Sequence, residues 1–137
     1  MWKYYAILSA VFASATALLA KAGVKGIDSN LATAIRTAVI LCITWGIVIV
    51  SGGIGHIRGI SRLNWTFLIL SGAATGLSWL FYFKALQTGA VSKVAPIDKL
   101  SVAFTIVLGI LLFHEPADLK VILGGALILA GSLVLIW

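Results

Sequence analysis

The chain is short of charge. Asp, Glu, Lys and Arg make up only 10% of its 137 residues, whereas a soluble domain carries about a quarter. A chain that is 61% hydrophobic cannot cover a globule of this length with polar side chains, which excludes an ordinary soluble domain. The composition therefore indicates a membrane protein, and the length leaves no room for a separate soluble domain.

Cysteine and catalytic motifs are equally scarce. Cys42 is alone and cannot form an internal disulfide, and the two histidines, His56 and His114, lie far apart, so we expect neither a metal site nor a cofactor. No P-loop, GxSxG or HExxH motif occurs, which argues against an ATP-driven pump or an intramembrane protease, and we expect no enzyme. The net charge of +6 comes from basic residues scattered at helix ends and in short loops, so the lipid bilayer, not nucleic acid, is the expected partner.

Five apolar stretches are long enough to cross about 30 Å of hydrocarbon at about 1.5 Å per residue. They predict membrane-spanning helices near residues 4–22, 31–50, 64–86, 94–113 and 119–137. The expected fold is therefore all-α integral membrane, with residues 1–137 as a single transmembrane domain. The first stretch also has features of a signal peptide, but it is nearly long enough to span and four further spans follow. Asp28, Ser29 or Asn30 can cap the second helix, and Asp118 can cap the fifth.

The basic residues do not favour one orientation. An odd number of spans places the N-terminus and the loops near residues 56–62 and 114–118 on one side of the membrane. The positive charges on the two sides are nearly balanced, so the positive-inside bias gives no firm orientation. One explanation is the weak signal of a short chain, and another is that the protein inserts both ways and pairs antiparallel. The charges of the first side are Lys3, Arg58, Arg62 and Lys120, and those of the second are Lys21, Lys25, Lys84 and Lys93, with Arg36 and Lys99 deeper.

Charged residues inside the predicted spans are the strongest functional signal. A charged side chain at the centre of a spanning helix costs about 2.5–3.5 kcal/mol on an insertion scale. Asp98 lies near the start of the fourth span, about 6 Å along its axis, just after Pro96. Ser101 and Thr105 share its helix face at spacings of three and four, and that face can line a polar cavity. The pattern predicts a solute or ion pathway here, with Pro96 as a weak point in the helix.

Other polar and aromatic residues join this prediction. Arg36 or Lys84 is a plausible partner for Asp98, whereas Asp98 and Lys99 point in different directions and are not an obvious pair. Trp79 and Tyr82 could line the same cavity. The alternative interpretation is structural: Lys84 and Lys99 would reach the interface with their long stems in lipid, Asp98 would cap a restarted helix, and the aromatic rings would pack.

Small residues mark possible helix contacts. In lipid, helix association relies on close packing, which small side chains permit. The sequence GAATG forms a GxxxG element, and a second group of small residues lies in the last span. These residues predict packing within the chain or the seam of a dimer. The positions are Gly72, Gly76, Gly124 and Gly131.

The second half of the chain resembles the EamA domain of the drug/metabolite transporter superfamily. The resemblance rests on the turn TGAVS, the segment PIDKLS, Gly109, Glu115 and the closing GGALILAGSLVLI. It implies a secondary transporter. Typical members join two five-helix repeats of opposite topology around a central cavity, whereas this chain has one repeat. The related small multidrug resistance proteins carry an essential glutamate in their first helix, and no acidic residue occurs at that place here.

We therefore expect a small secondary transporter in the cell inner membrane. It would move a small polar or amphipathic solute by alternating access. We expect it to work as an inverted homodimer with dual topology, in which the second copy supplies the missing repeat. The alternative is a non-transporting membrane subunit that packs with another membrane protein. The sequence identifies neither the solute nor the coupling ion.

Overall fold

The computed structural model describes residues 1–136, and these residues fold into helices and short connections, with no strand among them. Five segments are long and apolar enough to span a membrane, which confirms the predicted all-α membrane fold. Helices α4 and α5 together form the fourth of these spans. The helices are α1 (Trp2–Gly23), α2 (Ser29–Val50), the 3-10 helix η1 (Gly53–Gly59), α3 (Arg62–Thr88), α4 (Val91–Asp98), α5 (Leu100–Phe113) and α6 (Leu119–Ile136).

Two details of the predicted spans need correction. The fourth span begins at Val91 rather than near residue 94, and it is divided at Lys99 into α4 and α5. Asp98 therefore lies about 10 Å from the start of its span, at about 1.5 Å per residue, and deeper than expected. The long connection after α2 contains η1, which the sequence did not reveal. The predicted end of the last helix at Trp137 lies outside the described residues.

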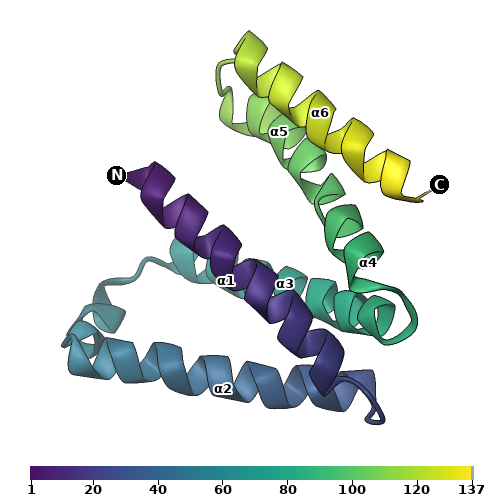
Figure 1. Cartoon of the computed structure of the whole chain (residues 1–137). Coiled ribbons are helices and arrows are strands. Elements are labelled where there is room, and N and C mark those ends of the chain that lie inside the picture. Colours follow the sequence, from purple (N-terminus) through teal and green to yellow (C-terminus); the bar gives the residue numbers. More distant parts are fainter. Residues whose placement is uncertain (137) are drawn as a thin grey trace. The chain divides into compact units, whose positions relative to one another are not determined.

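The chain forms two compact units, which we describe separately. The first unit comprises Met1–Leu18 and the chain from Thr88 onward, and the second comprises Leu19–Gln87. In the first unit α6 runs back along α5 and also contacts α4 (Figure 1). Gly125 is buried at this contact, where a β-carbon would lie 2.7 Å from the Cδ1 atom of Ile106. The absence of a side chain at Gly125 thus permits the close approach of α6 to α5.

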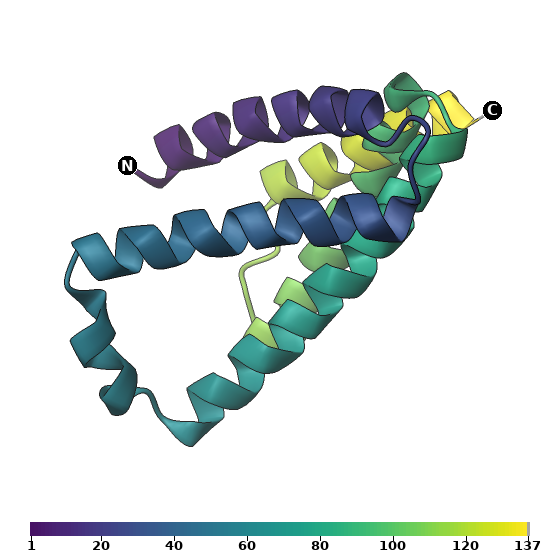
Figure 2. The ribbon, with the colours of Figure 1, turned by 90° about the horizontal axis from the view of Figure 1, so that it is seen from below.

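In the second unit the start of α2 and the last turns of α3 approach each other, and the two helices diverge toward η1 (Figure 2). Asp28 caps α2, because its carboxylate accepts hydrogen bonds from the amides of Asn30 (2.9 Å) and Leu31 (3.1 Å). The α1–α2 connection is held to the end of α3, since the Gln87 amide nitrogen donates to the Ile27 carbonyl at 2.8 Å.

The most deeply buried side chains of the second unit lie where the α1–α2 connection meets the end of α3. Val24 and Leu86 are fully buried, as is Ser29. Lys21 donates from its ammonium group to the Leu86 carbonyl at 2.5 Å. A cation suits the carbonyl end of a helix, both as a hydrogen-bond donor and as a partner of the helix dipole. This end of the unit is therefore tied by packing and by polar contacts together.

Elsewhere the spans present large apolar side chains outward. Phe81, Leu127 and Val134 are each about three-quarters exposed in the isolated chain. In water such exposure over whole helices would favour aggregation, whereas hydrocarbon is the matching solvent for it. The described surface is thus that of a chain whose helices face lipid.

The contact at Gly125 yields a stability prediction. Replacing Gly125 with leucine should lower the free energy of unfolding by about 1–3 kcal/mol, because the new side chain overlaps Ile106. Gly124→Leu is the matched control, since a β-carbon there meets no described atom within 4 Å. Thermal unfolding in detergent, followed by circular dichroism, measures both. Ile106→Ala should partly rescue Gly125→Leu, and equal effects of the two leucines would contradict the packing role of Gly125.

Candidate functional site

The fourth span is interrupted between α4 and α5. Pro96 has no amide hydrogen, so the Ser92 carbonyl one turn earlier loses its usual helical donor. The next hydrogen bonds tighten to a spacing of three: the Lys99 amide donates to the Pro96 carbonyl (3.0 Å), and the Val102 amide donates to the Lys99 carbonyl (2.9 Å). The break lies about 12 Å from Val91, roughly a third of the way along the span.

Hydroxyl groups supply donors around this break. The Ser132 hydroxyl of α6 donates to the Pro96 carbonyl at 3.0 Å, and Ser132 is buried. On α5 itself, the Ser101 hydroxyl donates to the Asp98 carbonyl (2.7 Å), and the Thr105 hydroxyl donates to the Ser101 carbonyl (2.8 Å). The predicted polar residues thus follow one another along α5, with their hydroxyls directed to the backbone. Unpaired backbone groups are costly in hydrocarbon, so these donors stabilise the broken helix.

The expectation that Asp98 and Lys99 do not pair is wrong. The Lys99 ammonium group lies 3.3 Å from a carboxylate oxygen of Asp98 and donates a hydrogen bond to it. Lys99 occupies the junction between α4 and α5, where the regular helical rotation between neighbours is interrupted, and its long stem can fold back. Asp98 remains 40% exposed in this pair, so the carboxylate keeps an accessible side.

In the second unit Arg36 lies against two aromatic rings. Its guanidinium carbon is 4.3 Å from the ring centre of Trp79 and 5.3 Å from that of Phe83. Trp79 and Phe83 are four residues apart, so both rings point from the same face of α3. Arg36 lies two turns into α2, about 10 Å from Ser29, and its guanidinium has cation–π contacts at that depth.

The chain provides no nearby carboxylate along this part of the sequence. Residues 29–97 contain no Asp or Glu, and the Asp28 carboxylate that precedes them is engaged by the amides at the start of α2. Aromatic faces therefore hold the Arg36 cation within the second unit. A guanidinium stacked on a ring keeps its in-plane N–H donors, which suit a carboxylate or phosphate group.

The remaining predicted residues are distributed between the two units. Tyr82 lies close enough to Arg36 to interact electrostatically, and its ring meets Phe83 edge-on at 6.5 Å. Lys84 is exposed on the last turns of α3. Asp98 belongs to the first unit and Arg36 to the second, so a pairing of Arg36 or Lys84 with Asp98 stays a prediction.

The four predicted packing glycines differ from Gly125. At Gly72, Gly76, Gly124 and Gly131 a β-carbon would meet no described atom within 4 Å. Their role as packing positions or as a dimer seam stays a prediction.

Sequence reasoning missed Ser132 and Phe83. A single hydroxyl in the apolar last helix was a usable signal for Ser132, because such groups in lipid usually have a hydrogen-bond partner. Phe83 follows Trp79 by four residues, which could have placed both rings beside one cation. Neither signal identifies the partner helix.

These features define a multi-pass helical membrane protein with an interrupted span and a charged residue held at depth. Comparison with family models matches residues 1–137 to the EamA-like transporter family, and the chain belongs to this family. A curated relative from a Sinorhizobium species, described as an uncharacterized transporter in the cobO 3′ region, is 48% identical over 134 residues, covering 98% of this chain and 95% of that protein. No solved structure matches the chain. Family and relative support a transporter rather than an enzyme.

The Ser132 contact can be tested by stability. Ser132→Ala should lower the free energy of unfolding by about 0.6–1 kcal/mol, because the Pro96 carbonyl loses its donor from α6. Thr105→Ala is the comparison, since its hydroxyl bonds only within α5. Unfolding in detergent–denaturant mixtures gives both values. A loss from Ser132→Ala no larger than that from Thr105→Ala would argue against a stabilising contact between α6 and the Pro96 carbonyl.

Proposed function

We propose that this protein is a small secondary transporter of the cell inner membrane. It moves a small polar or amphipathic solute by alternating access, and residues 1–137 act as one domain. Family membership supports the transporter class. The observation that carries the mechanism is the interruption of the fourth span at Pro96–Lys99, because transporters commonly build their binding sites at broken membrane helices.

The break between α4 and α5 provides a point where the span can bend and polar groups that can contact a solute or ion. The end of α4 offers backbone carbonyls, and the start of α5 offers the positive end of a helix dipole. Asp98 lies between them with an accessible carboxylate, where it serves as the counter-ion or proton-coupling group. Ser101 and Thr105 extend the polar face along α5. Bending at Pro96 then changes the access of Asp98 to either side of the membrane.

Arg36 is the proposed contact for an anionic group of the solute. Its cation–π contacts hold the guanidinium in place, and residues 29–97 contain no carboxylate to neutralise it. A charge inside the membrane is costly without a partner, which a carboxylate or phosphate of the solute provides. Trp79 and Tyr82 shape this place, and Lys84 adds positive charge toward the end of α3.

A second copy in inverted orientation would complete the pathway. Family members typically combine two such repeats of opposite topology, and this chain has one. The nearly balanced charges of the two membrane sides support insertion in both orientations. The four glycines without described neighbours at their β-positions offer surfaces where helices of two copies could approach closely.

Transport measurements test the site. In proteoliposomes supplied with labelled amino acids, sugars and organic anions, Asp98→Asn should lower the initial rate for the transported solute by about tenfold or more, which corresponds to about 1.4 kcal/mol. It should also flatten the dependence of the rate on pH, because the proposed proton-coupling carboxylate is removed. Arg36→Gln and Lys84→Gln should weaken transport of anionic solutes most.

Asp118→Asn is the matched control, because it removes a carboxylate just before α6, outside the interrupted span. Its transport rate should equal that of the unchanged protein. If Asp98→Asn, Arg36→Gln and Lys84→Gln all preserve the rate and its pH dependence, the proposed pathway is wrong.

Dual topology has its own test. Single cysteines placed at each terminus of a Cys42→Ala protein are labelled with a membrane-impermeant maleimide in intact cells and again after permeabilisation. An inverted homodimer predicts that about half of the molecules react from each side at both termini. A single labelled population would exclude the inverted homodimer while leaving a parallel assembly open.

A further inference from the structure

A groove lies where α2, η1 and α3 meet, within the second unit and away from Arg36. It encloses about 400 Å³, in the size range of small-molecule pockets. Its walls include Thr44, Trp45 and Val48 of α2, His56 and Ile57 of η1 and Trp65 of α3. We call this place the interfacial groove, because it spans the end of one membrane helix and the start of the next.

Two glycines build the groove. Gly52 adopts a left-handed conformation with φ 74°, which turns the chain sharply after α2. Gly53 then lies against Val48, since a β-carbon at Gly53 would be 3.3 Å from the Cγ1 atom of Val48. The turn folds η1 back beside the end of α2, so the groove is formed by the fold of the connection.

The groove is graded from apolar to basic. Thr44 lies about 9 Å before the end of α2, and its hydroxyl donates to the Ile40 (2.9 Å) and Leu41 (3.1 Å) carbonyls of its own helix. The deep part of the groove is thereby apolar. At the other end, η1 contributes His56 at the rim, and Arg58 follows in its last turn.

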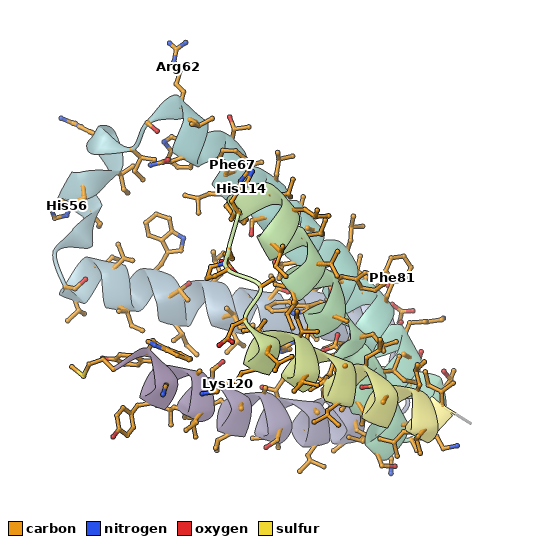
Figure 3. The ribbon with its side chains drawn as sticks, turned by 90° about the horizontal axis from the view of Figure 1, so that it is seen from above. His56, Arg62, Phe67, Phe81, His114 and Lys120 are labelled. Carbon is orange, nitrogen blue, oxygen red and sulfur yellow. The ribbon has the colours of Figure 1, made fainter. Side chains whose placement is uncertain are left out.

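The connection that carries the rim of the groove is basic and contains no carboxylate. Residues 51–64 contain His56, Arg58 and Arg62 and no Asp or Glu. Figure 3 shows His56 on η1 and Arg62 extending outward at the beginning of α3. Trp45 and Trp65 are 46% and 44% exposed beside the groove, and tryptophan rings prefer the boundary between hydrocarbon and headgroups.

We propose that the interfacial groove binds a phospholipid with an anionic headgroup. The acyl chain lies along Val48 and the two tryptophan rings, and the phosphate lies at η1 between Arg58 and Arg62. The charge of the rim complements the headgroup, and the depth of the apolar wall matches the upper part of an acyl chain. This site does not depend on the proposed transport function.

Lipid selectivity can be measured on the full-length chain. A protein with Trp2, Trp79 and Trp137 replaced by phenylalanine keeps Trp45 and Trp65 as the fluorescent reporters. It is reconstituted in vesicles of phosphatidylcholine with equal fractions of either brominated phosphatidylglycerol or brominated phosphatidylcholine, since bromine quenches nearby tryptophan. We expect the anionic lipid to quench tryptophan fluorescence more strongly than phosphatidylcholine at the same fraction.

Three variants locate the effect. Arg58→Gln and Arg62→Gln should each weaken the preference about fivefold, the ratio that one basic side chain gives at an anionic membrane surface. Val48→Phe should lower quenching by the anionic lipid without changing any charge, because it fills the apolar wall. Lys3→Gln with Lys120→Gln is the matched control, which removes two basic side chains outside the groove and should leave the preference intact.

A salt titration of the reporter protein tests the proposal without the arginine or groove variants. The preference should weaken as the salt concentration rises from 0.1 M to 1 M, because the screening length falls from about 10 Å to about 3 Å. Equal quenching by both lipids at low salt overturns the proposal. The proposal is also overturned if the Lys3/Lys120 control loses as much preference for the anionic lipid as the Arg58 and Arg62 variants do. That result would indicate a diffuse surface charge. If Val48→Phe changes self-association and leaves quenching unchanged, the groove is an interface between copies instead.

Discussion

Every backbone polar group in hydrocarbon needs a partner within the protein, and the fourth span departs from regular helical pairing at Pro96. Pro96 removes one helical donor, and the bonds that follow tighten to a spacing of three. Ser132 supplies a donor from another helix, which makes α6 part of the break. Ser132 and Gly125 are seven residues apart and both are buried, so they share one face of α6. The missing side chain at Gly125 lets α6 approach α5, and this approach brings Ser132 to Pro96. A small residue and a hydroxyl on one helix thus permit a discontinuity in another.

A charged side chain in the membrane also needs a partner, and Arg36 finds one in aromatic rings. A cation at this depth usually requires an anion, yet the chain offers no carboxylate between residues 29 and 97. The faces of Trp79 and Phe83 provide a weaker attraction that leaves the hydrogen-bonding edge of the guanidinium available. A built-in carboxylate would satisfy the cation permanently and compete with any solute. Aromatic contacts instead keep it in position while leaving its charge unneutralised within the second unit, as the proposed exchange of an anionic solute requires.

The helices could be predicted because their causes are local. The lengths of the apolar stretches predicted the five spans, and Asp28 was among the predicted caps of the second helix. The division at Lys99 follows from Pro96, whose position was recognised as a weak point, but where the helix resumes depends on tertiary contacts. Ser132 and Phe83 were missed because their partners lie on other helices, which periodicity cannot identify. The Asp98–Lys99 pair was misjudged because regular helical geometry was assumed at a junction between helices. Local patterns therefore predicted the scaffold, whereas the contacts of the site required the fold.

The two cationic places of the second unit are separated along α2. Arg36 lies about 21 Å from Val50, after which the chain turns into η1. The proposed headgroup place at Arg58 and Arg62 and the proposed solute contact at Arg36 are therefore two separate places. The places also differ in their surroundings: Arg36 lies against aromatic faces within the span, whereas the η1 arginines lie beside an apolar groove at the membrane boundary. A transporter surrounded by anionic lipid has to keep headgroups from occupying its solute site. Under the two proposals, the separation along α2 keeps a headgroup bound at η1 away from the proposed solute contact at Arg36.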